Sequence, residues 1–310
     1  MKPFLKWAGG KGKLIPQLLE YLPYDFSSQP ITYIEPFIGG GAMLFFILRN
    51  FTNVRKAVIN DINTRLIATY RTIKRNPQGV IDRLAAMQGD FYLLTPDEQK
   101  DYYMFARQRF NSGNLDDEEV SAHLIFLNHT CFNGLYRENA KGEFNVPFGR
   151  YTKPVICDAQ NILSVSRLLQ KVEILQGDFQ ATANYIDENT FFYLDPPYRP
   201  LSATSNFNSY SGNKFGDEEQ ERLKHFCDTL DARGCRFLLS NADCKSVNPE
   251  DDFFDYLYRQ YQIHRISAAR SINANPTKRG KLSELLICNY RNTASNAIVA
   301  EGETAYKKKV

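Results

Sequence analysis

The sequence predicts an α/β fold with a largely parallel sheet and a mainly helical insert, and three features indicate it. Four large apolar residues, Phe191 to Leu194, form a run typical of a strand that is buried on both faces. Residues 31–48 are typical of a strand, a glycine-rich loop and a buried helix. Between residues 63 and 158 the alternation of strands and helices stops and helical patterns replace it.

Length and composition agree with this fold class. The chain has 310 residues, 43% of them hydrophobic, which allows a complete α/β core and a second, smaller domain. No apolar run approaches the roughly 20 residues of a membrane span, and no signal peptide is recognisable. The six cysteines form no CxxC pair and the four histidines have no metal-ligand spacing. We therefore expect free thiols, an intracellular protein and no metal site.

The first segment, Phe4 to Lys11, contains two glycines between a tryptophan and a lysine. Glycines and cations in this pattern suggest a loop that closely approaches a ligand. Trp7 is the only tryptophan, and a role as a core anchor explains it equally well. Apolar residues at helical spacing follow, and Pro23 ends that predicted helix.

The next predicted strand runs into Glu35, Pro36, Phe37 and the three glycines Gly39 to Gly41. The pattern is neither G-x-G-x-x-G nor a P-loop, so it does not identify a ligand by itself. Asp61 lies 20 positions after Gly41 (61 − 41), at the end of the following predicted strand. A ribose-binding carboxylate is expected at about that spacing. Loop and acid together predict a ligand that carries a ribose.

The insert contains three predicted helices before a segment rich in arginine, aromatic residues and glycine. The helices are one near residues 64–73, a second over Asp97–Phe110 that Thr95 caps with Pro96 at its first position, and a third over Asp116–Leu127. Residues 128–151 follow, with arginines between aromatic side chains. Arginine can read guanine and a ring can stack or wedge between bases, so the segment favours nucleic acid. A solvated hairpin is the alternative.

Strands and helices alternate again after the insert. We predict strands near 172–175, 191–194, 237–241, 261–266 and 284–290, and a helix over 217–233. A polar loop spans 202–213. A loop with four cations spans 270–281, and its side chains could grip phosphates unless it is only solvated.

The predicted strand that ends at Leu194 leads into Asp195, Pro196, Pro197 and Tyr198. The prolines stop the strand and stiffen the turn, which lies where open α/β sheets bind ligands. Asp195 and the Pro196 carbonyl could accept hydrogen bonds from the exocyclic amino group of a nucleobase, and Tyr198 could stack on the base. An ordinary Pro-Pro turn is the alternative.

Taken together, these stretches resemble the DNA adenine methylase (Dam) family, including its DpnII-type members. The resemblance covers most of the chain, and the motifs stand in the family's order. It rests on F-L-K-W-A-G-G-K at 4–11, E-P-F-x-G-G-G at 35–41, N-D-I-N at 60–63, F-N-G-L-Y-R at 132–137, G-E-F-N-V-P-F-G-R-Y at 142–151, D-P-P-Y at 195–198, L-S-A-T-x-N-F at 201–207 and R-S-I at 270–272.

The resemblance implies a site-specific N6-adenine methyltransferase that uses S-adenosyl-L-methionine and flips its target base out of duplex DNA, at GATC. It implies a Rossmann-like methyltransferase sheet formed by residues 1–62 and 159–310, with a target-recognition domain at 63–158. It further implies a cytoplasmic enzyme of the bacterial nucleoid or of a phage-infected cell, without an obligate protein partner. The biological role, restriction-modification or another, stays open.

The same resemblance implies a catalytic, cofactor-binding or DNA-binding role for individual residues of these motifs. The catalytic turn would consist of Asp195, Pro196, Pro197 and Tyr198. The cofactor site would consist of Trp7, Lys11, Glu35, Phe37, Gly39, Gly40, Gly41, Asp61, Asp178 and Asp195. Arg137 would read a guanine with Leu135 and Pro147, Lys6 would read the flanking guanine, Phe132 would wedge into the base stack and Asn133 would support the separated pair. Some members have tyrosine at the position of Phe132 and arginine near His129.

Two alternatives share these features. An N4-cytosine or RNA amino-methyltransferase could use the same pocket chemistry, because only the insert argues for GATC. A catalytically inactive, sequence-specific DNA-binding protein could keep the fold, although the complete turn and glycine loop speak against it. A nicotinamide dehydrogenase fits poorly, since the glycine pattern differs.

Overall fold

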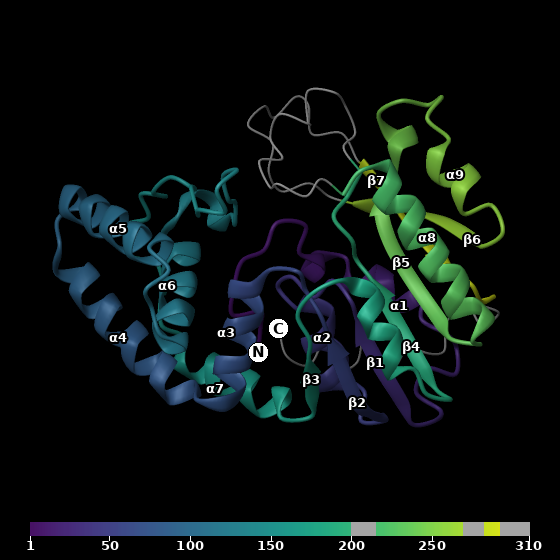
Figure 1. The fold of residues 1–310 in the computed structure, drawn as a ribbon, viewed down its shortest axis with the longest axis horizontal. Coiled ribbons are helices and arrows are strands. Elements are labelled where there is room, and N and C mark those ends of the chain that lie inside the picture. The colour runs from purple at the N-terminus through teal and green to yellow at the C-terminus, as the bar shows by residue number, and fades with distance from the viewer. Residues whose placement is uncertain (200–214, 269–281, 292–310) are drawn as a thin grey trace.

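The structure, a computed structural model, describes residues 1–199, 215–268 and 282–291. These residues contain a seven-stranded sheet, which occupies the right half of Figure 1. The strand order is β3-β2-β1-β4-β5-β7-β6. Strands β3 to β5 in this order are mutually parallel, whereas β7 is antiparallel to both neighbours. The strands are β1 (Ile31–Glu35), β2 (Val54–Ile59), β3 (Val172–Ile174), β4 (Thr190–Leu194), β5 (Arg236–Ala242), β6 (Gln262–Ala268) and β7 (Leu282–Cys288). This Rossmann-like sheet confirms the predicted fold class.

Two hydrophobic clusters cover the two faces of the sheet. Alternate residues of β4 belong to different clusters. Phe191 and Tyr193 pack into one cluster, and Phe192 and Leu194 pack into the other. The apolar run of β4 is therefore explained, because every side chain meets a packed layer. The α-helices are α1 (Ile15–Glu20), α2 (Ala42–Asn50), α3 (Thr64–Arg75), α4 (Pro77–Leu93), α5 (Pro96–Asn111), α6 (Asp117–Thr130), α7 (Ala159–Leu169), α8 (Asp217–Ala232) and α9 (Phe253–Leu257).

Helices α4, α5 and α6 stand to one side of the sheet, beyond α3 and α7 (Figure 1). Helix α6 packs against α3, α4 and α5 and buries almost its whole circumference. One hydrophobic cluster runs without interruption from the sheet through α7 into these helices. The division into residues 63–158 and the remainder therefore stays a prediction, although the insert is helical as expected.

The predicted starts of two insert helices are confirmed. Thr95 is the N-cap of α5 with Pro96 in the first turn, and Asp116 caps α6 by accepting a hydrogen bond from the Glu119 N–H. Helix α4 is not among the predicted helices. Gly79 and Gly89 lower its helix propensity, and only four of its 17 residues are buried apolar side chains.

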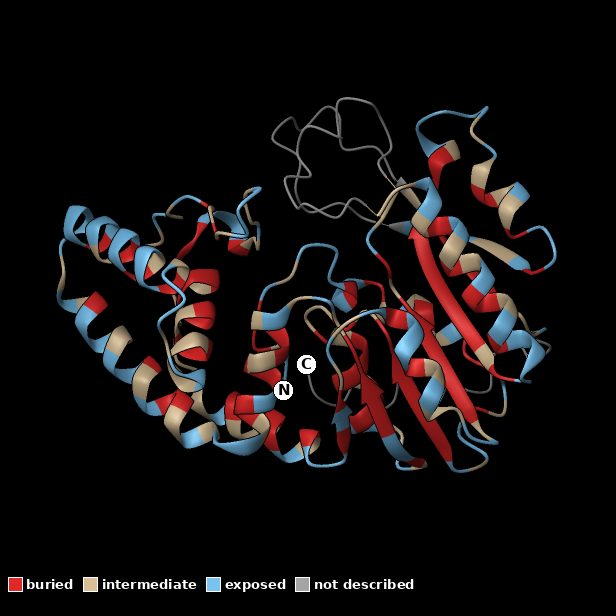
Figure 2. Cartoon of the chain, viewed as in Figure 1, coloured by how far each residue is buried: buried red, intermediate tan, exposed pale blue. Residues whose placement is uncertain are grey.

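Burial is deepest along the parallel strands, and exposure rises at their ends (Figure 2). Among the described residues, no helix is long and apolar enough to cross a membrane. The motif at 201–207, the polar loop at 202–213 and the basic loop at 270–281 lie outside the described residues.

Candidate active site

Four of the predicted acidic residues lie at one edge of the sheet, because each ends or follows a neighbouring parallel strand. Glu35 ends β1, Asp61 follows β2, Asp178 follows β3 and Asp195 follows β4. In parallel sheets this edge is where ligands bind. Residues up to 160 positions apart (195 − 35) are thereby brought together.

The glycine loop between β1 and α2 requires glycine for two reasons. Gly39 and Gly41 have φ angles of 45° and 71°, which side chains other than glycine rarely adopt. A Cβ on Gly39 would lie 2.9 Å from the Trp7 ring, and one on Gly41 would lie 2.5 Å from the Tyr70 hydroxyl. The predicted cofactor residue Trp7 therefore lies directly against the predicted glycine loop.

Asp61 is held by backbone N–H groups. Its Oδ2 accepts a hydrogen bond from Gly39 N (3.1 Å) and its Oδ1 accepts one from Asn63 N (2.9 Å). Burial raises the pKa of Asp61, and these N–H groups counteract the rise. Within the described ranges, no lysine or arginine forms an ion pair with it. Each carboxylate oxygen keeps acceptor capacity, which suits the hydroxyl groups of a ribose.

Asn60 joins the loops that follow three strands. Its Nδ2 donates to the Pro36 carbonyl (3.0 Å) and to the Gly177 carbonyl (2.9 Å). Its Oδ1 is buried without a hydrogen-bond partner among the described residues. A buried acceptor of this kind is unusual in a native fold, and it indicates a polar group that the fold itself does not supply.

Phe37, in the loop after β1, and Asp178, in the loop after β3, also belong to this edge of the sheet. The Phe37 ring packs against Phe179, with 5.2 Å between the ring centroids. Asp178 is exposed and forms an ion pair with Arg222 (2.7 Å). Phe37 therefore offers an aromatic wall, whereas Asp178 already has a cationic partner.

The turn after β4 presents two hydrogen-bond acceptors that have no partner among the residues that the structure describes. Asp195 Oδ1 accepts a hydrogen bond from the Ser240 hydroxyl at 2.9 Å and forms an ion pair with the Lys11 ammonium, also at 2.9 Å. Asp195 Oδ2 and the Pro196 carbonyl accept no hydrogen bond from any residue that the structure describes. The Pro197 carbonyl accepts from Gln220 Nε2 at 3.2 Å, which ties the turn to α8.

Lys11 is 4% exposed, and its ammonium lies between two carboxylates and an aromatic ring. The Nζ atom is 2.9 Å from Asp195 Oδ1, 3.8 Å from Glu284 Oε2 and 4.4 Å from the centroid of the Tyr198 ring. It also donates to the Gly9 carbonyl at 3.0 Å. The space beside Asp195 Oδ1 thus already accommodates a nitrogen that carries N–H donors.

The Tyr198 hydroxyl donates to Glu284 Oε2 at 2.8 Å. Burial, followed by the negative charges of Asp195 and Glu284, raises the pKa of Tyr198 well above its ordinary value. The hydroxyl therefore stays protonated and remains a donor at physiological pH.

Glu35 is fully buried, and its Oε1 accepts a hydrogen bond from the Tyr33 hydroxyl at 2.5 Å. Burial raises the pKa of Glu35 to about 8, and the charge of Asp195 contributes to the rise. The Tyr33 hydrogen bond opposes it. Glu35 is therefore mostly protonated at neutral pH.

This titration predicts a pH-dependent stability. The folded state holds a proton on Glu35 that the unfolded chain releases near pH 4.5, so the stabilisation is complete below pH 4.5 and disappears as the pH rises to about 8. In that window the group lowers the free energy of unfolding by up to about 1.4 kcal/mol per pH unit. Urea unfolding measures the free energy of unfolding at pH 5.5 and at pH 8. Between these two pH values this free energy should decrease less for Glu35→Gln than for the wild type. Glu173→Gln, an exposed glutamate on β3, is the matched control, and an equal decrease in all three proteins would contradict the assignment.

Residues 131–151, most of the segment whose sequence favours nucleic acid, form a hairpin-like loop after α6, here called the recognition loop. Isolated bridges pair Cys131 with Phe148 and Glu138 with Phe144. The Phe132 side chain is 51% exposed, while its N–H donates to the Pro147 carbonyl at 2.8 Å. Asn133 is exposed and has a φ of 56°, in the left-handed region. An exposed ring on a tightly tied backbone is suited to insert between bases.

Arg137 is exposed in the first half of this loop, and one neighbour holds its side chain. Its Nε donates to Asn145 Oδ1 (2.7 Å) and its Nη2 donates to the Asn145 carbonyl (3.3 Å). Leu135 is half-buried and packs against the core. The guanidinium is therefore oriented before any ligand arrives, and Nη1 is without a partner among the described residues.

Lys6 and Trp7 connect this loop to the glycine loop. The Lys6 backbone exchanges hydrogen bonds with the Asn128 side chain, and Asn128 also donates to the Gly134 carbonyl. A Cβ on Gly134 would lie 2.4 Å from the Lys6 side chain. The Trp7 ring stacks on Tyr136, with 5.1 Å between centroids. The predicted cofactor residue Trp7 is thus in contact with the loop that is predicted to bind DNA, through Tyr136 of that loop.

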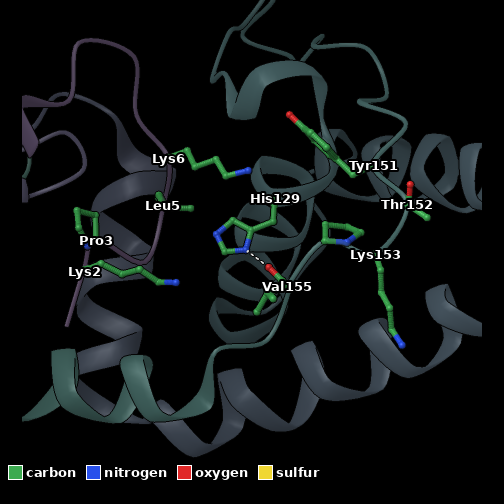
Figure 3. A pocket seen from close by; sticks show the side chains of 10 residues that line it. Lys2, Pro3, Leu5, Lys6, His129, Tyr151, Thr152, Lys153 and Val155 are labelled. Atoms are coloured by element: carbon green, nitrogen blue, oxygen red, sulfur yellow. Dashed lines mark hydrogen bonds between the residues drawn. The ribbon is translucent and has the colours of Figure 1, made fainter. Parts of the chain in front are cut away.

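A cationic pocket of about 470 Å³ adjoins Lys6 (Figure 3). Lys2, Lys6 and Lys153 line it, together with Tyr151 and His129. The His129 ring lies between the carbonyls of Phe4 (3.1 Å) and Val155 (2.8 Å), so it links the N-terminal segment to the segment after the loop.

Several residues of this region are not among the predicted site residues. They are Ser240, Glu284, Tyr70, Asn128, Tyr136 and the pocket lysines Lys2 and Lys153. Ser240 and Glu284 each stand next to an apolar run, Phe237 to Leu239 and Leu285 to Cys288, and this is the one sequence signal that they carry. The others lack a pattern of their own, because their roles arise from contacts distant in sequence.

Comparison with known proteins identifies relatives along most of the chain. The sequence profile of the D12 class N6 adenine-specific DNA methyltransferases matches residues 7–272. The type II methyltransferase M.MjaIII of Methanocaldococcus jannaschii is 45% identical over 94% of this chain and 99% of its own. The DNA adenine methylase of Haemophilus influenzae is 34% identical over 92% of each chain. Among solved structures, the rRNA methyltransferase AviRa of Streptomyces viridochromogenes aligns over 95% of this chain and 84% of its own, with 11% identity and a TM-score of 0.33.

Proposed function

The chain belongs to the D12 class N6 adenine-specific DNA methyltransferase family and is therefore an adenine-specific DNA methyltransferase; from this premise we propose its donor, its target sequence and its mode of attack. The donor is S-adenosyl-L-methionine. The target is the adenine of 5′-GATC-3′ in duplex DNA, and the enzyme rotates this adenine out of the helix. We place the enzyme in the cytoplasm, the compartment that contains its DNA substrate.

The observation that carries the proposal is the pair of acceptors on the turn after β4 that no described residue hydrogen-bonds. An adenine amino group has two N–H donors, and Asp195 Oδ2 and the Pro196 carbonyl would accept one each. The Tyr198 ring would stack on the base. Lys11, whose ammonium lies beside Asp195 and over this ring, supports the view that an N–H-bearing nitrogen fits there.

The residues along the sheet edge fit the donor. Asp61 would accept hydrogen bonds from the ribose hydroxyls, and the Phe37 ring would pack against the donor. The buried Asn60 Oδ1, which has no partner among the described residues, could accept a hydrogen bond from it. Trp7 and the glycine loop would border the amino-acid part. When bound, S-adenosyl-L-methionine supplies a methyl group on a positively charged sulfur.

The turn would act mainly by positioning. Asp195 and Pro196 fix the amino group and localise its lone pair, so that the nitrogen attacks directly, without a covalent enzyme intermediate. Asp195 acts as a hydrogen-bond acceptor rather than as a strong base, since the amine releases its proton far more readily after it has gained the methyl group. A base inside the duplex cannot reach this turn, which requires its extrusion at a cost of a few kcal/mol.

The recognition loop supports the choice of a duplex target. The exposed ring of Phe132 would fill the gap that an extruded base leaves, with Asn133 beside it, and the Arg137 guanidinium, held by Asn145, would contact a guanine. Leu135, Pro147 and Lys6 would complete the readout. The pocket lysines Lys2 and Lys153 suit a backbone phosphate. The names of the relatives favour adenine in DNA over cytosine or RNA.

The proposed function is tested with plasmid DNA that lacks adenine methylation. Incubation with the enzyme and S-adenosyl-L-methionine should make the DNA resistant to a nuclease that GATC methylation blocks, and sensitive to one that requires it. Mass spectrometry of the digested nucleosides should find N6-methyladenine. Methylated cytosine, or methyladenine outside GATC, would refute the proposed specificity.

A further inference from the structure

We propose that Glu284 is a positioning residue of the active site, which holds Lys11 when the target base displaces that lysine from Tyr198. The inference rests on the proposed function, because it assumes that an adenine stacks on Tyr198 and donates to Asp195. It assigns a role to a strand outside the Asp-Pro-Pro-Tyr turn.

Glu284 occupies an unusual place for a carboxylate. It lies on β7, where it pairs with Ala242 of β5 and Ile266 of β6. The following residues of β7 are buried and apolar: Leu285, Leu286, Ile287 and Cys288. The Glu284 side chain is only 18% exposed. A carboxylate in such a setting requires polar partners, and its partners here, Tyr198 and Lys11, both belong to the active site.

Lys11 lies where the target base is expected. Its Nζ is 4.4 Å from the centroid of the Tyr198 ring and 2.9 Å from Asp195 Oδ1. The ring face that Lys11 covers is therefore the face that the Asp195 carboxylate borders. A base that stacks on this face and donates to Asp195 needs the space of the ammonium, so Lys11 has to move first.

Glu284 can become the counter-ion of Lys11 once the lysine has left Asp195. Lys11 is 4% exposed, and a buried cation that loses its counter-ion is strongly destabilised. Glu284 Oε2 is already 3.8 Å from Nζ, so a small side-chain movement exchanges one carboxylate for the other. The Tyr198 hydroxyl donates to the same oxygen and holds the carboxylate in place during the exchange. Lys11 thereby leaves Asp195 free without losing a counter-ion.

The test separates the charge of Glu284 from its shape. Glu284→Gln keeps an acceptor for the Tyr198 hydroxyl but removes the charge, Glu284→Asp keeps the charge, and Glu173→Gln is the control on an exposed strand position. Methyl transfer to a GATC duplex gives kcat and KM. Fluorescence of 2-aminopurine at the target adenine reports the extruded base.

We expect Glu284→Gln to lower kcat by about tenfold, the range of coupling between contacting charges. KM for DNA should stay within about twofold, because recognition-loop contacts are untouched. The 2-aminopurine signal should fall, and Glu284→Asp should recover part of both losses. In a Lys11→Met background, Glu284→Gln should no longer change the fluorescence, since no ammonium has to leave.

Two results would overturn the inference. Either Glu284→Gln matches the wild type in kcat and fluorescence, or its effect on fluorescence persists unchanged in the Lys11→Met background. The second comparison also detects a general folding defect, which would persist there. A wild-type enzyme that methylates no GATC duplex would instead overturn the proposed function, so the two failures are distinguishable.

Discussion

Replacement of Asp195 by alanine should reduce kcat for methyl transfer by at least about a hundredfold, the loss typical when a preorganised hydrogen-bonding group is removed from a reacting centre. Asp195 provides Oδ2, which accepts no hydrogen bond from the described part of the chain, and its contacts with Ser240 and Lys11 fix the geometry of the turn. The Kd for duplex DNA should change little, because the recognition loop lies on a different part of the chain. Tritium transfer from labelled donor and a gel-shift titration measure the two quantities.

Asp252→Ala is a suitable control for this variant. Asp252 is exposed and makes no side-chain capping hydrogen bond at the start of α9. It should retain wild-type turnover. Near-normal turnover of Asp195→Ala would refute the role of the turn, whereas loss of DNA binding together with turnover would indicate a structural defect.

Replacement of Arg137 by alanine should relax the choice of base at one guanine of the target. A bidentate contact between arginine and guanine contributes about 1–3 kcal/mol of discrimination, or roughly 5- to 150-fold. Asn145 holds the Arg137 guanidinium in place, so little further ordering is needed to make this contact. Sequencing of methylated plasmid sites should reveal methylation at sequences that differ from GATC at that position.

Lys141→Ala is the matched control, because Lys141 is exposed on the same loop and carries no predicted base contact. It should weaken binding at most slightly and equally for all sequences. An unchanged site preference in Arg137→Ala would contradict the assignment of this arginine as the reader of a guanine.

Features that depend on short stretches of sequence were predictable. The apolar run before Asp195 predicted a buried central strand, and Thr95 and Asp116 predicted helix starts, because local patterns decide these elements. Helix α4 was missed for the same reason: its two glycines and its few buried apolar residues leave hardly any local signal.

Contacts between distant residues were not predictable from pattern alone. Lys11 and Asp195 are 184 positions apart (195 − 11), and only the parallel sheet brings them within 2.9 Å. Glu284 joins them because β7 inserts antiparallel between β5 and β6, a topology that no motif encodes. The stacking of Trp7 on Tyr136 likewise depends on how the insert packs beside the glycine loop.

The central claim is that the turn after β4 binds the amino group of an extruded adenine. A crystal structure of the enzyme with a GATC duplex and a non-reactive donor analogue tests it most directly. We predict that the target adenine lies outside the helix on Tyr198, with its amino nitrogen about 2.7–3.2 Å from Asp195 and from the Pro196 carbonyl oxygen. An adenine that is still paired in the duplex, or one whose amino group contacts neither acceptor, would contradict the claim.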